Sequence, residues 1–188
     1  MITCSDSRID GTVIKVSLRT IILYVDNRGD MVSDVTVIGI RGGASFDDIV
    51  GHFTSLGGEV ILMDPLQVYG SPMLISAVAH AERAFERNEN SSRNILTEII
   101  LYASGERQIS KALSKMGPKE GCEEYVALLL DVEGDLKLDS IGMERDDSIV
   151  DGNDSKAEAM GLTNGLSIPY DDLALERVAM VDILKKSK

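Results

Sequence analysis

The sequence has 188 residues, the size of one domain or of one domain with an extension. Its formal net charge of −12 disfavours broad electrostatic attraction to nucleic acid. Charges interrupt the apolar runs before they reach membrane-spanning length, and the start lacks the pattern of a signal peptide. With two cysteines that lack metal-binding spacing, the composition indicates a cytoplasmic protein.

The charge is distributed unevenly along the chain. Residues 118–188 carry eight Lys and Arg against seventeen Asp and Glu. Residues 81–117 carry six against five. Only this middle segment is not acidic, so only it could face a phosphate backbone.

The chain opens with the motif CSDSR at residues 4–8. It resembles the Cys-x-Asp-Ser-Arg zinc signature of β-class carbonic anhydrases. A catalytic zinc needs three protein ligands, and that pattern calls for a later His-x-x-Cys. Neither His52 nor His80 is followed by such a cysteine, and the only other cysteine is Cys122. We therefore expect a chance match and no metal, and a zinc lyase stays the third hypothesis.

The first half of the chain predicts strands and helices in alternation. Apolar residues over 12–25 predict a strand, followed by the turn VDNRGD. A second strand is expected over 35–40, and Ser45 is expected to cap a short helix. Residues 59–63 predict a third strand, and Ser71-Pro72 predicts the start of a longer helix.

The second half predicts two helices, a hairpin, a loop and a final helix. Ser92 is expected to cap a helix that ends near Tyr102, and Ser104 to cap another. Residues 125–132 and 136–143 read as the two strands of a hairpin. Residues 144–165 read as an acidic loop, and 170–186 as an amphipathic helix.

This order of elements predicts an α+β fold, with a mixed or antiparallel sheet, helices packed against it and a C-terminal amphipathic helix. The glycines of Gly39-x-x-Gly42-Gly43 are better explained by a tight turn than by a phosphate loop. The sequence contains no convincing catalytic set. It therefore favours a binding or scaffold protein over an enzyme, with no catalytic residues and no cofactor.

Two stretches, ILMDPLQV and RNILTEIILYASGERQISKALSKMG, carry a more specific pattern. Asp64-Pro65 and Gln67 follow a strand, Arg93 precedes a Thr-Glu-Ile-Ile helix, and an Ile-Ser-x-Ala-Leu helix closes on Gly117. In order and spacing this resembles the TPRKB family, the Cgi-type kinase-binding subunit of the KEOPS complex. That complex takes part in threonylcarbamoyl-adenosine modification of tRNA.

The resemblance implies two binding surfaces and no catalytic centre. The first is the C-terminal helix, which would dock on the kinase-like ATPase of KEOPS. Its expected interface residues are Leu173, Val178, Met180, Val181, Ile183 and Leu184. The alternative is that these apolar residues bury the helix in the protein's own core.

The second implied surface would bind tRNA at its single-stranded 3′ CCA end. The expected RNA-binding residues are Arg93, Asn94, His80, Arg83, Arg107 and Lys111. His80 departs from the lysine of the family pattern, which weakens that assignment because a neutral His adds no charge. The alternative for each arginine is that it is an ordinary exposed helix residue in a local ion pair and does not bind RNA.

We therefore expect residues 33–188 to form a single TPRKB-like domain and residues 1–32 an N-terminal extension with a possible extra strand. Alternatively, Met31 is the true first residue and the residues before it are a translated leader. The expected protein is a non-catalytic, archaeal-type KEOPS subunit that binds the kinase-like ATPase and tRNA. The alternative is a stand-alone kinase regulator that does not bind RNA.

Overall fold

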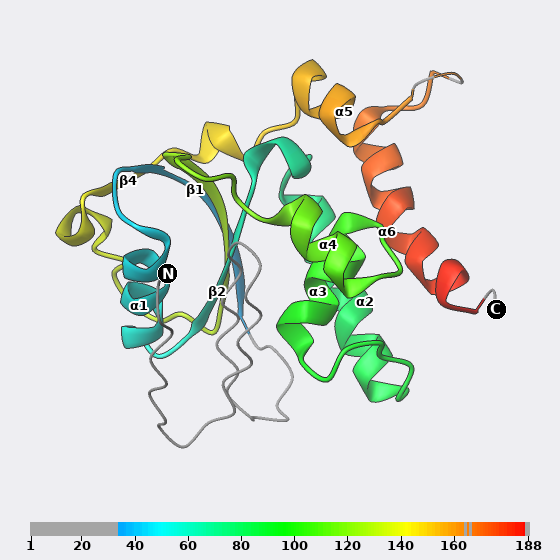
Figure 1. Cartoon of the computed structure of the whole chain (residues 1–188), viewed down its shortest axis with the longest axis horizontal. Coiled ribbons are helices and arrows are strands. Elements are labelled where there is room, and N and C mark those ends of the chain that lie inside the picture. Colours follow the sequence, from blue (N-terminus) through cyan, green and yellow to red (C-terminus); the bar gives the residue numbers. More distant parts are fainter. Residues whose placement is uncertain (1–33, 164, 166, 187–188) are drawn as a thin grey trace, which may run out of the picture.

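The computed structural model describes residues 34–163, 165 and 167–186, and these form an α+β fold, as expected (Figure 1). The motif at residues 4–8, the strand predicted over 12–25 and Met31 lie outside the described residues. The strands are β1 (Val35–Gly42), β2 (Glu59–Met63), β3 (Glu124–Leu130) and β4 (Met143–Arg145). The α-helices are α1 (Phe46–Ser55), α2 (Ser71–Glu86), α3 (Ile95–Ser104), α4 (Ile109–Met116), α5 (Asp154–Met160) and α6 (Tyr170–Lys186).

The four described strands form one antiparallel sheet in the order β2-β3-β1-β4. Val35 of β1 lies opposite Leu130 of β3, and Ile40 of β1 lies opposite Arg145 of β4. β3 therefore has a neighbour on each side.

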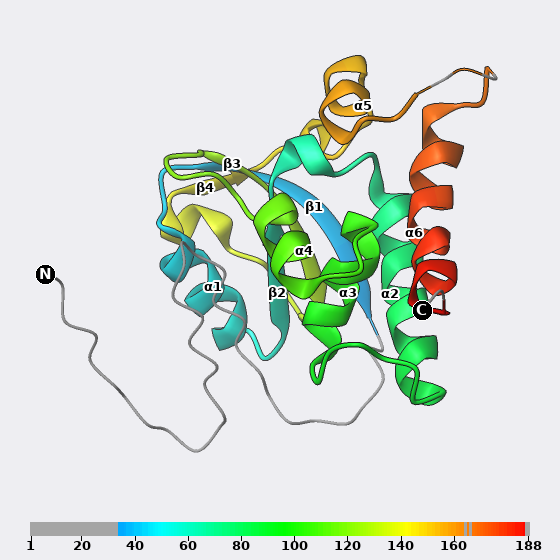
Figure 2. The same ribbon diagram turned by 45° about the vertical axis from the view of Figure 1, so that its right-hand side comes forward.

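Side chains alternate between the two faces of the sheet and bury against different helices. Ile38 and Ile40 of β1 pack with Ile49 and Phe53 of α1 on one face. On the other face, residues such as Leu128 of β3 pack against the core that includes α2, α3 and α6. Figures 1 and 2 show α1 on one side of the sheet and the α2–α4 group with α6 on the other. The described part of the chain thus has three layers.

The predicted hairpin is wrong. Residues Leu138–Ile141 form a 3₁₀ turn, and the short β4 that follows pairs with β1 rather than with β3. The reason is that β1 and β2 already occupy both edges of β3, so no edge is left for a hairpin partner.

Two predicted helix caps are also wrong. The Asn94 side chain, not that of Ser92, caps α3 by accepting hydrogen bonds from the amides of Leu96 and Thr97 at 2.6 and 3.4 Å. Ser104 is the last residue of α3 rather than a cap. Gly105 follows in the left-handed conformation and stops the helix, so α4 begins only at Ile109.

The segment predicted as an acidic loop contains a helix. The Asn153 side chain caps α5 by accepting from the amide of Lys156. The Lys156 side chain is buried, and its Nζ donates to the carbonyl oxygen of Ile149 at 2.5 Å. Two polar residues of this segment thus have structural roles, the helix cap of Asn153 and the buried hydrogen bond of Lys156. The composition of the segment does not reveal either role.

Gly39 lies within β1 and is needed there for close packing. A Cβ at this position would approach the carbonyl oxygen of Asp146 to 2.0 Å. The amide of Asp146 donates to the Gly39 carbonyl at 2.9 Å. The close approach of the Asp146 backbone therefore explains why a residue without a side chain is needed at position 39.

Within the described ranges, each helix is too short or too polar to cross a membrane.

Candidate functional site

Helix α6 lies along α2 with one face toward the core and one toward solvent (Figure 2). Ala174, Val178 and Val181 are fully buried. Met180 and Ile183 are 39% and 60% exposed.

The six residues expected to dock a partner therefore divide into three groups. Val178 and Val181 belong to the chain's own core, and a partner cannot reach them without moving α6. Leu173 and Leu184 are partly buried. Met180 and Ile183 form the accessible part of the expected surface.

A buried ion pair holds the C-terminal half of α6. Glu98 of α3 is 0% exposed, and its carboxylate accepts a hydrogen bond from Lys185 of α6. The same carboxylate accepts from the amides of Ser91 and Ser92 at 2.8 to 3.1 Å. Lys185 also lies 4.1 Å from the centre of the Tyr102 ring. The charge of Glu98 is thus compensated by one cation and two backbone amides.

A second set of contacts continues from this pair toward α2. Tyr102 accepts a hydrogen bond from Lys185 Nζ at 3.0 Å and donates to Asp182 Oδ1 at 2.5 Å. Asp182 Oδ2 lies 2.9 Å from His80 Nδ1. The cluster of Glu98, Lys185, Tyr102, Asp182 and His80, hereafter the α6 anchor, connects α6 with both α2 and α3.

Burial and hydrogen bonding shift two pKa values within the α6 anchor. Burial and the hydrogen bond to Asp182 raise the pKa of the Tyr102 hydroxyl far above its usual range, so this group stays a neutral donor. Burial alone would raise the pKa of Asp182. The hydrogen bonds from Tyr102 and His80, with the electrostatic interactions of His80 and Lys185, outweigh that effect and lower the pKa. Asp182 is therefore held as a carboxylate.

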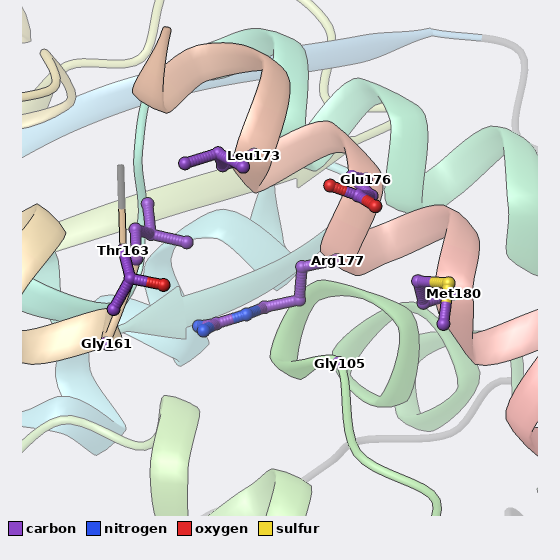
Figure 3. A pocket seen from close by; sticks show the side chains of 8 residues that line it. Gly105, Gly161, Thr163, Leu173, Glu176, Arg177 and Met180 are labelled. Atoms are coloured by element: carbon purple, nitrogen blue, oxygen red, sulfur yellow. The ribbon is translucent and has the colours of Figure 1, made fainter. Parts of the chain in front are cut away.

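An open hollow of about 250 Å³ lies beside the other half of α6. The C-cap Gly105 of α3, the end of α5 and one side of α6 line it. Figure 3 shows Arg177 extending from α6 toward Gly161 and Thr163. Arg177 Nη2 donates to the carbonyl oxygen of Met160, whereas Nη1 is buried and lacks a hydrogen-bond partner among the described residues.

Two of the expected RNA-binding residues are partly buried and use their side chains in structural contacts. His80 is largely buried and is part of the α6 anchor. Asn94 caps α3 with its side-chain oxygen. Both would have to give up those contacts, or use other atoms, to bind a nucleotide.

The other four expected residues are exposed cations in two groups. Arg83 is in the last turn of α2, and Arg93 lies in the loop that leads to α3. Arg107 and Lys111 lie at the opposite end of α3, where α4 begins. Since α3 has ten residues, the two groups are separated by roughly 15 Å along that helix.

Aromatic side chains contribute little to this surface. Each Phe and Tyr residue that the structure describes is at least partly buried. Phe85 of α2 is partly exposed and is near Arg83 in the sequence. The cations, rather than stacking side chains, are therefore the accessible feature.

The zinc hypothesis gains no support from the described residues. His52 Nε2 is 2.6 Å from the carbonyl oxygen of Leu136, and His80 contacts Asp182. No group of three potential metal ligands occurs within the described ranges. Cys4 lies outside them.

Sequence reasoning missed the α6 anchor and the hollow. Glu98 and Lys185 look like ordinary polar helix residues because their partners are far away in the chain. One available signal was Glu98, which lies among apolar residues in NILTEIILYA.

The comparisons point to a partner-binding protein. The family described as kinase binding protein CGI-121 matches residues 52–187, which is more than half of the chain. The matched range includes α2, α3, α4, α5 and α6. A comparison with curated proteins found no match.

Proposed function

The chain belongs to the CGI-121 family of kinase-binding proteins, and on this basis we propose that it is a non-catalytic subunit of an archaeal-type KEOPS complex. In this role it binds the kinase-like ATPase of the complex and the 3′ CCA end of tRNA. It thereby supports threonylcarbamoyl-adenosine modification, whose chemistry takes place on other subunits.

The exposed face of α6 is the observation that best supports kinase binding. Met180 and Ile183 are large apolar side chains that are well exposed. The opposite face of the same helix is fixed by buried residues and by the α6 anchor. A rigid helix that presents apolar side chains loses little conformational entropy when a partner covers it.

A titration with the kinase-like ATPase from the same genome tests this role. We expect Ile183→Glu to weaken binding at least about tenfold, because it places a charge in an apolar contact. Ile75→Glu is the matched control, since Ile75 is an apolar residue of α2 with 51% exposure. Equal affinities for Ile183→Glu and the wild type would contradict docking through α6.

The tRNA role is supported by the four exposed cations. They lie in the only segment of the chain that is not net acidic. Their two groups are far enough apart to contact different phosphates of an extended single strand. Because exposed aromatic side chains are scarce here, we expect phosphate contacts to dominate and binding to fall steeply with salt.

The test compares full-length tRNA with the same tRNA lacking its CCA end. We expect Arg93→Glu to remove the preference for the CCA end at low salt. Lys137→Glu is the control, because it changes the net charge equally at an exposed residue outside both groups. If tRNA does not bind but the kinase does, the alternative of a stand-alone kinase regulator is favoured.

A further inference from the structure

The loop between α2 and α3, residues 88–94, carries Arg93 and is hereafter the Arg93 loop. Arg93 is exposed and is one of the four cations proposed to contact tRNA. The helices fix both ends of this loop. The amide of Glu89 donates to the carbonyl oxygen of Ala84 in α2 at 2.8 Å, and the side chain of Asn94 caps α3. The shape of the segment between these ends therefore determines where Arg93 lies.

The centre of the Arg93 loop is held by the carboxylate of Glu98. The amides of Ser91 and Ser92, the two residues before Arg93, donate to this carboxylate at 2.8 to 3.1 Å. The Ser92 hydroxyl in turn donates to the carbonyl oxygen of Asn94 at 2.5 Å. Hydrogen bonds thus fix the backbone on each side of Arg93, and one buried carboxylate accepts from two of the loop amides.

The charge of Glu98 is compensated by a residue from a distant part of the chain. This residue is Lys185 of α6, which lies 87 positions later in the sequence. Stability alone explains the pair poorly, because apolar residues of similar volume often stabilise a protein as well as a buried ion pair does. Apolar side chains cannot accept hydrogen bonds, however, so they could not replace Glu98 as the acceptor for the loop amides. The shape of the Arg93 loop is therefore the feature that needs a carboxylate at this position.

We propose that Glu98 and Lys185 are positioning residues for RNA binding, which hold the Arg93 loop in the shape that places Arg93 against a tRNA phosphate. The inference rests on the proposed tRNA role. Glu98 is 0% exposed and cannot contact RNA, so it acts through the loop. A loop that is already ordered loses less conformational entropy on binding than a mobile loop does.

Replacing Glu98 with Gln separates positioning from a simple effect of charge. The Gln side chain has nearly the same shape, but one oxygen becomes an NH₂ donor. In either orientation this donor faces the loop amides or Lys185, so one set of contacts is lost. Charge alone predicts tighter RNA binding, because a negative group is removed. Positioning predicts weaker binding, so the two explanations give opposite signs.

Glu89→Gln is the matched control, because it removes the same charge from the same loop. The Glu89 side chain is 48% exposed, and its contact with Lys186 is long, at 4.0 Å. Its loss should leave the shape of the loop unchanged. Glu98→Asp keeps the charge but shortens the side chain, and it provides a second variant in case Glu98→Gln does not fold. Thermal melting of each variant shows whether the fold is kept.

The measurement is a titration of each full-length variant with full-length tRNA at low salt. We expect Glu98→Gln and Glu98→Asp to weaken binding at least about fivefold, because the released loop must be ordered again. We expect Glu89→Gln to bind tRNA as tightly as the wild type or more tightly. Hydrogen exchange at the Ser91 and Ser92 amides should be faster in both Glu98 variants than in the wild type.

The outcomes distinguish this inference from the proposed function. Wild-type or tighter tRNA binding by a folded Glu98→Gln variant overturns the positioning role and leaves the tRNA role intact. Weaker binding with unchanged exchange at Ser91 and Ser92 also overturns it, because the loop would then have kept its shape. If the wild type does not bind tRNA, the tRNA role and the positioning role both fall.

Discussion

Replacing Lys185 with Met tests the α6 anchor most directly. The change keeps most of the side-chain length but leaves Glu98 buried without its cation. Breaking a buried ion pair by removing one partner costs about 3–5 kcal/mol. Because the amides of Ser91 and Ser92 still donate to Glu98, we expect a value near the lower end. The lost contact with the Tyr102 ring adds about 0.5–1 kcal/mol.

The expected loss is therefore about 3–4 kcal/mol in the free energy of unfolding, measured by urea denaturation at pH 7. The double variant Lys185→Met with Glu98→Gln supplies the control. Removing both charges should recover at least about 1 kcal/mol, because no charge is then left buried and unpaired. A loss below about 1 kcal/mol for Lys185→Met, the range of exposed ion pairs, would refute this reasoning.

Three further changes test other parts of the fold. Gly105→Ala should destabilise the protein by about 1–2 kcal/mol in urea denaturation, because its φ of 71° disfavours a side chain and the new Cβ displaces Arg177. Asn94→Ala should cost about 1 kcal/mol in the same assay through loss of the α3 cap. Asp182→Asn should cost stability at neutral pH, and the difference from wild type should shrink as the solution is acidified.

The sign of the last effect follows from the lowered pKa of Asp182. A carboxyl whose pKa is lower in the folded state contributes stability above its ordinary value of 3.8. That contribution is lost as the pH falls from 3.8 through the folded pKa. A stability difference between Asp182→Asn and the wild type that is constant from neutral to strongly acidic pH would contradict this prediction.

For Gly105→Ala and Asn94→Ala, unfolding free energies equal to that of the wild type would contradict the predictions.

Local patterns along the chain predicted many of the elements. The strand over 59–63, the cap at Ser45 and the final helix follow from periodicity and capping chemistry, and the structure confirms them. The hairpin prediction failed because the pattern of residues 136–143 does not reveal which strand edges are free. That information depends on where β1 and β2 pair with β3, which is decided by contacts between distant parts of the chain.

The candidate site was predictable only in outline. Amphipathic periodicity located α6, but it could not separate Val178 and Val181, which are buried, from Met180 and Ile183, which are exposed. Similarly, composition identified a segment that is not net acidic, but it did not reveal the contact of His80 with Asp182. Such contacts join residues about a hundred positions apart, and short sequence motifs contain no signal for them.

The order of strands in the sheet has a consequence for how the chain folds. Each pairing among the described strands joins residues far apart in sequence, such as Val35 with Leu130 and Glu59 with Leu130. Non-local pairing slows folding because the chain must close long loops first. During synthesis, β1 and β2 emerge well before β3, the strand that joins them. The helices between β2 and β3 can form locally in that interval, so we expect the sheet to assemble late, after β3 has left the ribosome.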